Sequence, residues 1–100
     1  MDSSLDTLFK MLKNELNITW DDEETELRLS RIVLNATKVM DRKLGATIDY
    51  SLPGQEQELF IAYCMYVYNN VANEFDENYL NEIMQIRILH EVEDYSDEED

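Results

Sequence analysis

The side chains that most often carry out catalysis are scarce in this sequence of 100 residues. It contains one histidine, His90, and one cysteine, Cys64, which lies inside an apolar run. These two residues fall short of the three or four ligands that a zinc site normally takes, and a thiol in apolar surroundings is unreactive by default. Both glycines are isolated, so they form no glycine-rich phosphate loop. The sequence therefore predicts a protein that is not an enzyme and that needs no cofactor or metal ion.

The densest group of carboxylates occupies residues 21–26, where five of the six side chains are acidic. A calcium loop alternates its ligands around a central glycine, and this segment has neither feature. Asp21, followed three residues later by Glu24, instead has the pattern of a helix capping box. Acidic side chains also stabilise the positive end of a helix dipole. We therefore interpret this group as the start of a helix.

Charge and composition exclude further classes of protein. Eight Lys and Arg against 23 Asp and Glu give a net charge of −15, which opposes binding to nucleic acid or to an anionic membrane surface. The longest apolar run, residues 59–68, is about half as long as a membrane span, and the sequence has no pattern of a secretory signal. A hydrophobic fraction of 44% is typical of a folded chain, and this length fits one domain.

Apolar residues recur mainly at helical spacing, and we predict an all-α fold, a small bundle of about four helices. The first helix follows Ser3 or Ser4 and stops at Asn17. The second is long and runs from residue 21 to Leu44, because Gly45 fits the left-handed position that follows a helix end. The third, residues 55–75, is apolar nearly all round and is therefore expected to be buried.

Two segments have a less certain pattern. Residues 46–53 form a connector, with a short extended piece predicted at residues 47–50. The last element, residues 77–92, begins with helical spacing, but from Ile86 onward apolar and polar residues alternate as in a strand. Arg87 falls among Leu80, Ile83 and Met84 on a helical wheel, so we expect it to form a structural ion pair with a carboxylate.

The C-terminus is the one place where the composition changes. Residues 91–100 contain seven acids and no base, which is nearly half of the net charge. We therefore divide the chain into a helical domain, residues 1–92, and an acidic tail, residues 93–100. A charge run of this kind is either a solvated, disordered tail or an arm that becomes ordered on a basic partner.

The predicted second helix has a basic stripe beside its apolar side. The stripe consists of Arg28, Arg31, Lys38 and Arg42, half of the cations in the chain, and Leu27 and Leu34 lie next to it. It is either a solvated face that pairs with surplus acids or a subunit interface for an acidic neighbour. The same two interpretations apply to Tyr63 and Tyr66, which either cover the core or contribute to an interface.

The order of these elements resembles that of the small head–tail connector (adaptor) proteins of tailed bacteriophages. The resemblance extends over about residues 5–95, from "LFKMLKNELNI" to "ENYLNEIMQIRILHEVEDY". Its clearest parts are the acid-capped helix that ends at Leu44 and Gly45, and the segment 79–92. The very acidic last ten residues depart from the family pattern.

The resemblance implies a virion protein at the head–tail joint, assembled in the host cytoplasm. Such proteins form a ring, usually twelvefold, below the portal; the ring extends the DNA channel and holds a head-closure or tail-completion protein. DNA passes through without specific binding, and no membrane is involved. A C-terminal segment commonly contacts the portal, which in this chain corresponds to residues 90–100. The residues expected to dock are His90, Glu91, Val92, Glu93, Asp94 and Tyr95.

Two other functions are compatible with a small acidic protein. One is a DNA mimic that inhibits a DNA-binding host protein by occupying its basic groove. The other is a general helical scaffold that binds a partner helix. The acids of this chain gather at a helix start and in the tail, and a basic stripe interrupts them, which favours the connector over the mimic.

Overall fold

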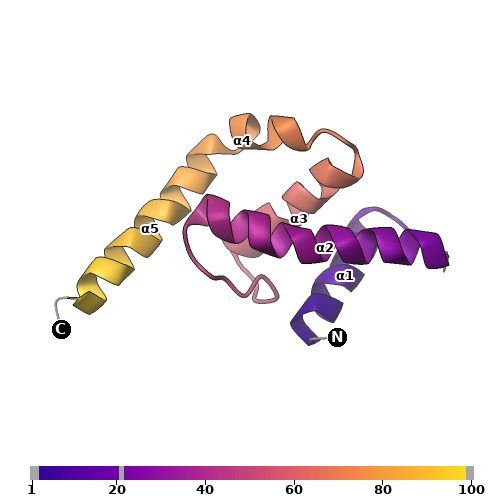
Figure 1. Ribbon diagram of the computed structural model, residues 1–100, viewed down its shortest axis with the longest axis horizontal. Coiled ribbons are helices and arrows are strands. Elements are labelled where there is room, and N and C mark those ends of the chain that lie inside the picture. The colour runs from indigo at the N-terminus through magenta and orange to yellow at the C-terminus, as the bar shows by residue number, and fades with distance from the viewer. Residues whose placement is uncertain (1–2, 21, 99–100) are drawn as a thin grey trace.

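The computed structural model describes residues 3–20 and 22–98, and these residues form an all-α fold without a strand. The helices are arranged as Figure 1 shows. In chain order they are α1 (Ser3–Glu15), α2 (Glu23–Leu44), α3 (Gln55–Tyr68), the 3-10 helix η1 (Ala72–Glu74), α4 (Phe75–Asn78) and α5 (Leu80–Glu98). The prediction of an all-α fold is therefore confirmed.

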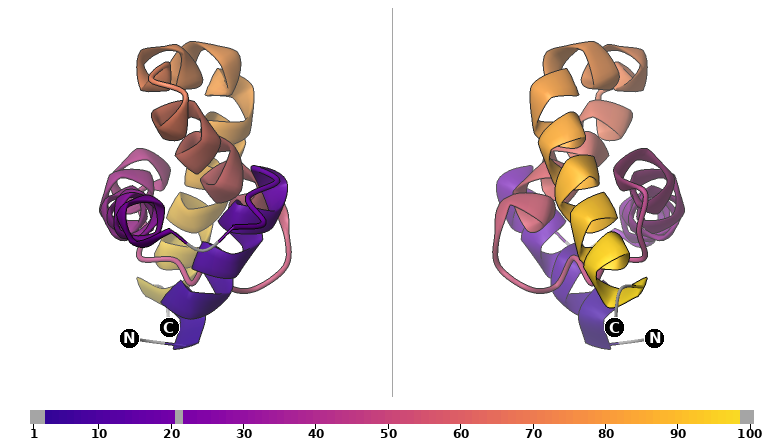
Figure 2. Two further views of the ribbon diagram at one scale, coloured as in Figure 1. Left: turned by 90° about the vertical axis from the view of Figure 1, so that its right-hand side faces the viewer. Right: turned by 90° about the vertical axis from the view of Figure 1, so that its left-hand side faces the viewer.

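Helix α2 is the axis on which the others are assembled. Helices α1, α3 and α5 all pack against it, and α1 also contacts α3. Figure 2 shows α2 nearly end-on beside the other helices, with α4 at the end of the molecule away from α1. Helix α5 leaves this bundle at the end opposite to the start of α2 (Figure 1), which gives the molecule an elongated shape of 51 × 30 × 18 Å.

One continuous core joins these helices. It contains only apolar side chains, and no buried polar or charged residue occurs in the described part. Helix α2 contributes Leu29, Ile32, Val33, Ala36, Met40 and Leu44, and α3 contributes Leu59, Phe60, Ile61 and Cys64. Burial raises the pKa of the Cys64 thiol to about 12, so the free cysteine serves as a core side chain.

The start of α2 corrects the predicted cap. The side chain of Asp22 accepts a hydrogen bond from the backbone N–H of Thr25 at 3.1 Å and another from its hydroxyl at 2.8 Å. The cap is therefore one residue later than the predicted pair of Asp21 and Glu24, and Asp21 lies outside the described residues. The acids Glu23, Glu24 and Glu26 then occupy the first turn, where the helix dipole favours negative charge.

The end of α2 agrees with the sequence prediction. Gly45 has a φ of 74°, and its N–H donates to the carbonyl of Asp41 at 2.9 Å. The carboxylate of Asp41 also accepts the N–H of Ile48 at 3.2 Å and the hydroxyl of Tyr50 at 2.8 Å. Tyr50 is 1% exposed and stacks on Phe60 at 4.6 Å. The carboxylate of Asp49 in turn accepts the N–H and the hydroxyl of Ser51. Two carboxylates therefore hold the connector as a loop, and the extended piece predicted at residues 47–50 is not a strand.

Helix α3 is shorter than predicted, because it stops at Tyr68 and not at residue 75. Asn70 takes a left-handed conformation with a φ of 63°, which short polar side chains tolerate. The chain then turns back through η1, so that Phe75 is fully buried between Tyr63 and Tyr79. In the sequence, the helical spacing of apolar residues continues from α3 through this turn. The spacing therefore did not predict that α3 ends at Tyr68.

Helix α5 also differs from its prediction. Tyr79 separates the short α4 from α5, and α5 then continues to Glu98 through the segment with strand-like alternation. Ile83 and Ile86 are buried, whereas Ile88 is 54% exposed. The alternation is therefore a coincidence of two apolar helix faces. The helical backbone is uninterrupted at residues 92 and 93, and the division into a domain and a tail there stays a prediction.

The left-handed cap at Gly45 makes a testable prediction. Gly45→Ala should lower the free energy of unfolding by about 1 kcal/mol, because an L side chain is strained at this φ even though space around it is open. Gly45→Asn should lose less, since asparagine tolerates the left-handed region. Urea denaturation of the three proteins measures both effects, and equal stabilities of the alanine and glycine proteins would contradict the assignment.

Candidate functional site

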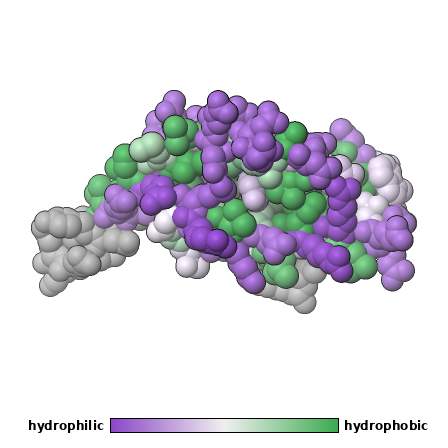
Figure 3. Space-filling model, turned by 45° about the horizontal axis from the view of Figure 1, so that its top comes forward, coloured by the Kyte–Doolittle hydropathy of each residue, from purple (hydrophilic) through white to green (hydrophobic). Residues whose placement is uncertain are grey.

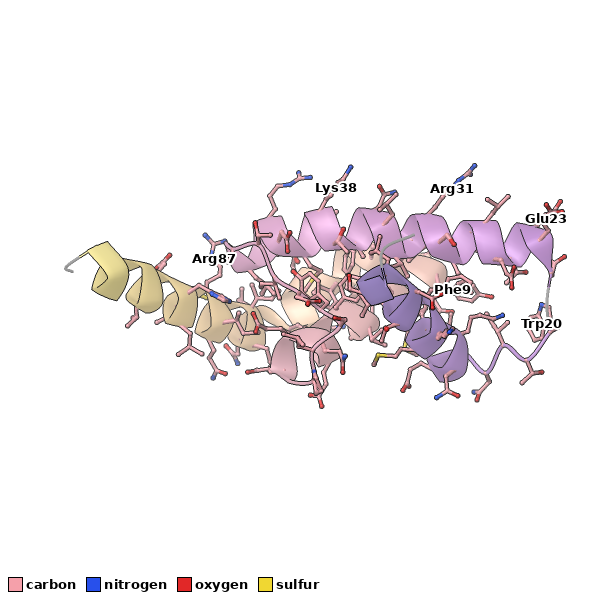
Figure 4. The ribbon with its side chains drawn as sticks, turned by 90° about the horizontal axis from the view of Figure 1, so that it is seen from below. Phe9, Trp20, Glu23, Arg31, Lys38 and Arg87 are labelled. Atoms are coloured by element: carbon pink, nitrogen blue, oxygen red, sulfur yellow. The ribbon has the colours of Figure 1, made fainter. Side chains whose placement is uncertain are left out.

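The outward side of α2 is the candidate site that the sequence predicted. Arg31, Lys38 and Arg42 are exposed there, and Figure 4 shows Arg31 and Lys38 pointing away from the rest of the bundle. Within the described residues, these three cations have no ion pair or hydrogen bond. They are therefore free to meet an acidic group from another molecule.

Arg28, the fourth cation of the basic stripe, is used inside the chain. Its guanidinium donates to the carbonyl of Tyr68 at 2.9 Å and lies 4.6 Å from the centre of the Tyr68 ring. The last carbonyls of a helix have no partner within the helix and attract cations. Arg28 therefore ties α2 to the end of α3, and the structure separates it from the three free cations.

Two grooves run along the sides of the α2 face. The first, of about 600 Å³, lies between α2 and α3, and all four cations of the stripe line it together with Tyr63 and Val67. The second, of about 320 Å³, lies between α1 and α2 and is almost wholly apolar. Its walls are Leu5, Phe9, Leu27, Ser30, Arg31, Val33 and Leu34. Leu27 and Arg31 line both grooves and form the ridge between them.

Leu27 and Leu34, which were predicted at an interface, lie on the outward side of α2. They are 54% and 50% exposed. Two half-exposed leucines beside three unpaired cations form an apolar centre with a charged rim, which is the usual anatomy of a protein interface. The α2 face, defined here as Leu27, Arg31, Leu34, Lys38 and Arg42, therefore has the chemistry of a protein-binding surface.

The two tyrosines that were predicted at the same interface have different surroundings in the structure. Both pack edge-on against Phe75, at 5.1 Å for Tyr63 and 5.5 Å for Tyr66. Tyr63 also reaches the groove beside α2. Tyr66 does not line that groove, and its hydroxyl accepts a hydrogen bond from Asn78 at 2.9 Å. Its interactions hold the junction of α3, α4 and α5 together.

Among the described residues, Arg87 has no carboxylate partner, and an ion pair across an interface stays a prediction. Its guanidinium donates to the backbone carbonyl of Lys43 at 3.3 Å, and Figure 4 shows it beside the C-terminal end of α2. Lys43 pairs with Asp76 at 2.6 Å. In the described part of the chain, Arg87 thus stabilises the negative end of the α2 dipole, which is why a cation lies among apolar residues without an ion pair.

The predicted portal-docking segment divides into two parts. His90 is directed into the molecule, where its Nε2 lies 2.8 Å from a carboxylate oxygen of Glu56 at the start of α3. Glu91 and Val92 are exposed. The side chains of Glu93, Asp94 and Tyr95 lie outside the described residues, and docking by this segment stays a prediction.

An apolar stripe on α5 was missed by the sequence analysis. Leu80, Met84, Ile88 and Val92 recur every four residues, and each is more than half exposed. Figure 3 shows hydrophobic side chains at this end of the molecule, close to the C-terminal residues. The spacing is visible in the sequence, but on a helical wheel Leu80 and Met84 lie near Ile83 and Arg87, so the pattern did not separate an exposed face from a buried one. Two apolar faces on one helix cannot be told apart by periodicity alone.

Other kinds of site find no support in the part of the chain that the structure describes. No three His, Cys, Asp or Glu side chains gather so that they could hold a metal ion. None of the described helices has both the length and the apolar character that crossing a membrane requires. The chain matches no protein-family model, no curated protein and no solved structure.

The division of the basic stripe can be tested by stability. Arg28→Ala should lower the free energy of unfolding by about 1–2 kcal/mol, because the Tyr68 carbonyl and ring both lose a cationic partner. Arg31→Ala removes a side chain without such contacts and should change stability by less than about 0.5 kcal/mol. Thermal or urea unfolding compares the two, and equal losses would contradict the division.

Proposed function

We propose that this protein is a structural head–tail connector of a tailed bacteriophage and that it forms a ring below the portal. The observation that carries the proposal is a pair of different exposed faces on one small bundle. One is the α2 face and the other is the apolar stripe on α5. A ring needs a heterologous contact, in which two different surfaces of each subunit meet, and this chain offers two such surfaces.

The charge distribution supports a channel through which DNA passes. The net charge is −15, and a negative lumen does not hold phosphate groups. Many copies of such a chain also repel one another, so ring assembly should depend on salt or require the portal as a template. The proposed role is therefore structural and not enzymatic, with DNA as a passing cargo.

The proposed partners are a second copy of the chain, the portal, and a head-closure or tail-completion protein. The protein then belongs to the virion at the head–tail joint, and to the host cytoplasm during assembly. The acidic segment that follows His90 is the part proposed to meet the portal. A helix that projects from the bundle, as α5 does in Figure 1, is able to reach a neighbouring ring.

The α2 face also argues against a DNA mimic. A mimic must present negative charge to a basic groove, whereas Arg31, Lys38 and Arg42 stand exposed along the longest helix of the bundle. Positive charges at these positions would repel a DNA-binding groove. The connector is therefore the better account of the same acidic composition.

Charge reversal on the α2 face tests the ring. Arg31→Glu and Lys38→Glu, singly and together, should abolish ring formation without changing the far-UV circular dichroism, because both side chains are exposed and lack internal partners. Lys10→Glu changes the charge equally on α1, where Lys10 makes an exposed pair with Asp6, and should still assemble. Electron microscopy and light scattering, with and without a portal ring, read the outcome; rings formed by the double variant would refute the role of this face.

Charge removal in the tail tests portal docking. Asp97→Asn with Glu98→Gln should weaken capture of the chain by an immobilised portal protein, and deletion of residues 94–100 should weaken it further, because the tail loses its charge. Glu74→Gln with Glu77→Gln removes the same charge from exposed positions near α4 and should leave capture unchanged. Undiminished capture of the deleted chain would refute docking by the tail.

A further inference from the structure

Helix α5 carries an apolar surface that none of the other described residues covers. Leu80, Met84, Ile88 and Val92 are 53%, 51%, 54% and 57% exposed. At four-residue spacing they form one stripe, on the opposite side of α5 from the buried Ile83 and Ile86. A helix that is apolar on two sides is normally covered on both. The second side of α5 is therefore a surface in need of a partner.

The apolar groove between α1 and α2 has the matching chemistry. Its walls are apolar apart from Ser30 and Arg31, and Leu27 and Leu34 stand half-exposed at its edge. Its volume of about 320 Å³ accommodates a few large aliphatic side chains. The unpaired Arg31, Lys38 and Arg42 continue along the same helix, so the groove is apolar on one side and bordered by positive charge on the other.

We propose that the apolar stripe of α5 in one copy packs against the α2 face of the next copy. The aliphatic side chains of the stripe enter the groove between α1 and α2. Glu91, which is exposed on the same side of α5 as the stripe, faces the free cations of α2. This inference rests on the proposed ring, and it names the two surfaces that meet at each subunit contact.

Charge complementarity identifies the occupant as a second copy of this chain. The chain as a whole carries a net charge of −15, whereas the α2 face holds three cations that have no ion pair with any described residue. Pairing of two α5 stripes with each other would bring acidic segments of both copies into the same contact and gain no opposite charge. The contact between α5 and α2 joins apolar to apolar and negative to positive surface.

The two surfaces cannot meet within one chain. The groove lies beside the first half of α2, whereas α5 departs from the other end of α2 (Figure 1). The molecule is 51 Å long, so the stripe and the groove face different neighbours. Such a heterologous arrangement continues from subunit to subunit, and it forms a ring when the rotation between neighbours closes.

Two matched double variants test the contact by mixing. The stripe variant is Met84→Glu with Ile88→Glu, and the groove variant is Leu27→Glu with Leu34→Glu. All four positions are half-exposed or more, so both variants should keep their helicity. Trp20→Glu with Leu52→Glu makes the same chemical change at two exposed apolar positions outside both surfaces and serves as the control.

The inference predicts a particular result for the mixture. Each variant alone should stay monomeric, with self-association weakened roughly 30-fold or more relative to the unchanged chain. An equal mixture should form a complex of two chains and no larger species, because only one intact stripe and one intact groove remain. The unchanged chain and the control should form larger assemblies at about 0.5 M salt, which screens their repulsion, or on a portal ring. Sedimentation and native mass spectrometry measure these sizes.

The contrary outcomes separate this inference from the proposed function. Dimers of the groove variant alone would show that α5 stripes pair with each other, and rings formed by either variant would show that other surfaces meet; both overturn the inference and leave the connector standing. An unchanged chain that stays monomeric in high salt and on the portal would overturn both. If the two variants form the two-chain complex but the unchanged chain is not captured by the portal, the contact between α5 and α2 is supported and the connector function is overturned.

Discussion

The fold depends on the burial of one side of helix α2, because α1, α3 and α5 all pack on this helix. Six α2 side chains are buried, and each large aliphatic side chain among them contributes about 1.5–3 kcal/mol by leaving water. One side of α2 therefore forms the core, and the opposite, exposed side of the same helix is the candidate interface.

Helix ends account for a second level of organisation. A carbonyl at the end of α3 accepts a hydrogen bond from the Arg28 guanidinium. Carbonyls at the end of α2 accept hydrogen bonds from the Gly45 N–H and the Arg87 guanidinium. Asp41 extends the same arrangement into the loop that follows, where the buried Tyr50 hydroxyl needs an acceptor. The chain has eight cations, and those that bond to carbonyls at helix ends are not available to bind another molecule. The few that remain unpaired are therefore concentrated in one place, and this gives the α2 face its chemical identity.

A strongly acidic chain must limit its own repulsion before it can associate. The negative charge is concentrated in the first turn of α2 and in the last ten residues, at opposite ends of the molecule (Figure 1). The first group is stabilised by the helix dipole, and the second lies at the far end of α5. The α2 face lies between these two groups and presents two leucines and three cations, so a neighbour meets less repulsion there.

The sequence by itself determined the helical class, the extent of α2 to Leu44, its left-handed glycine cap and the apolar side that enters the core, because local spacing and capping chemistry act within a few residues. It also placed the basic stripe and its two leucines on one helix. Only the tertiary structure decided that α3 stops at Tyr68, that Arg28 and Arg87 bind carbonyls of other helices, and that α5 has a second, uncovered apolar face. Each of these depends on contacts between residues far apart in the chain, and helical periodicity cannot tell which of two apolar faces another helix will cover.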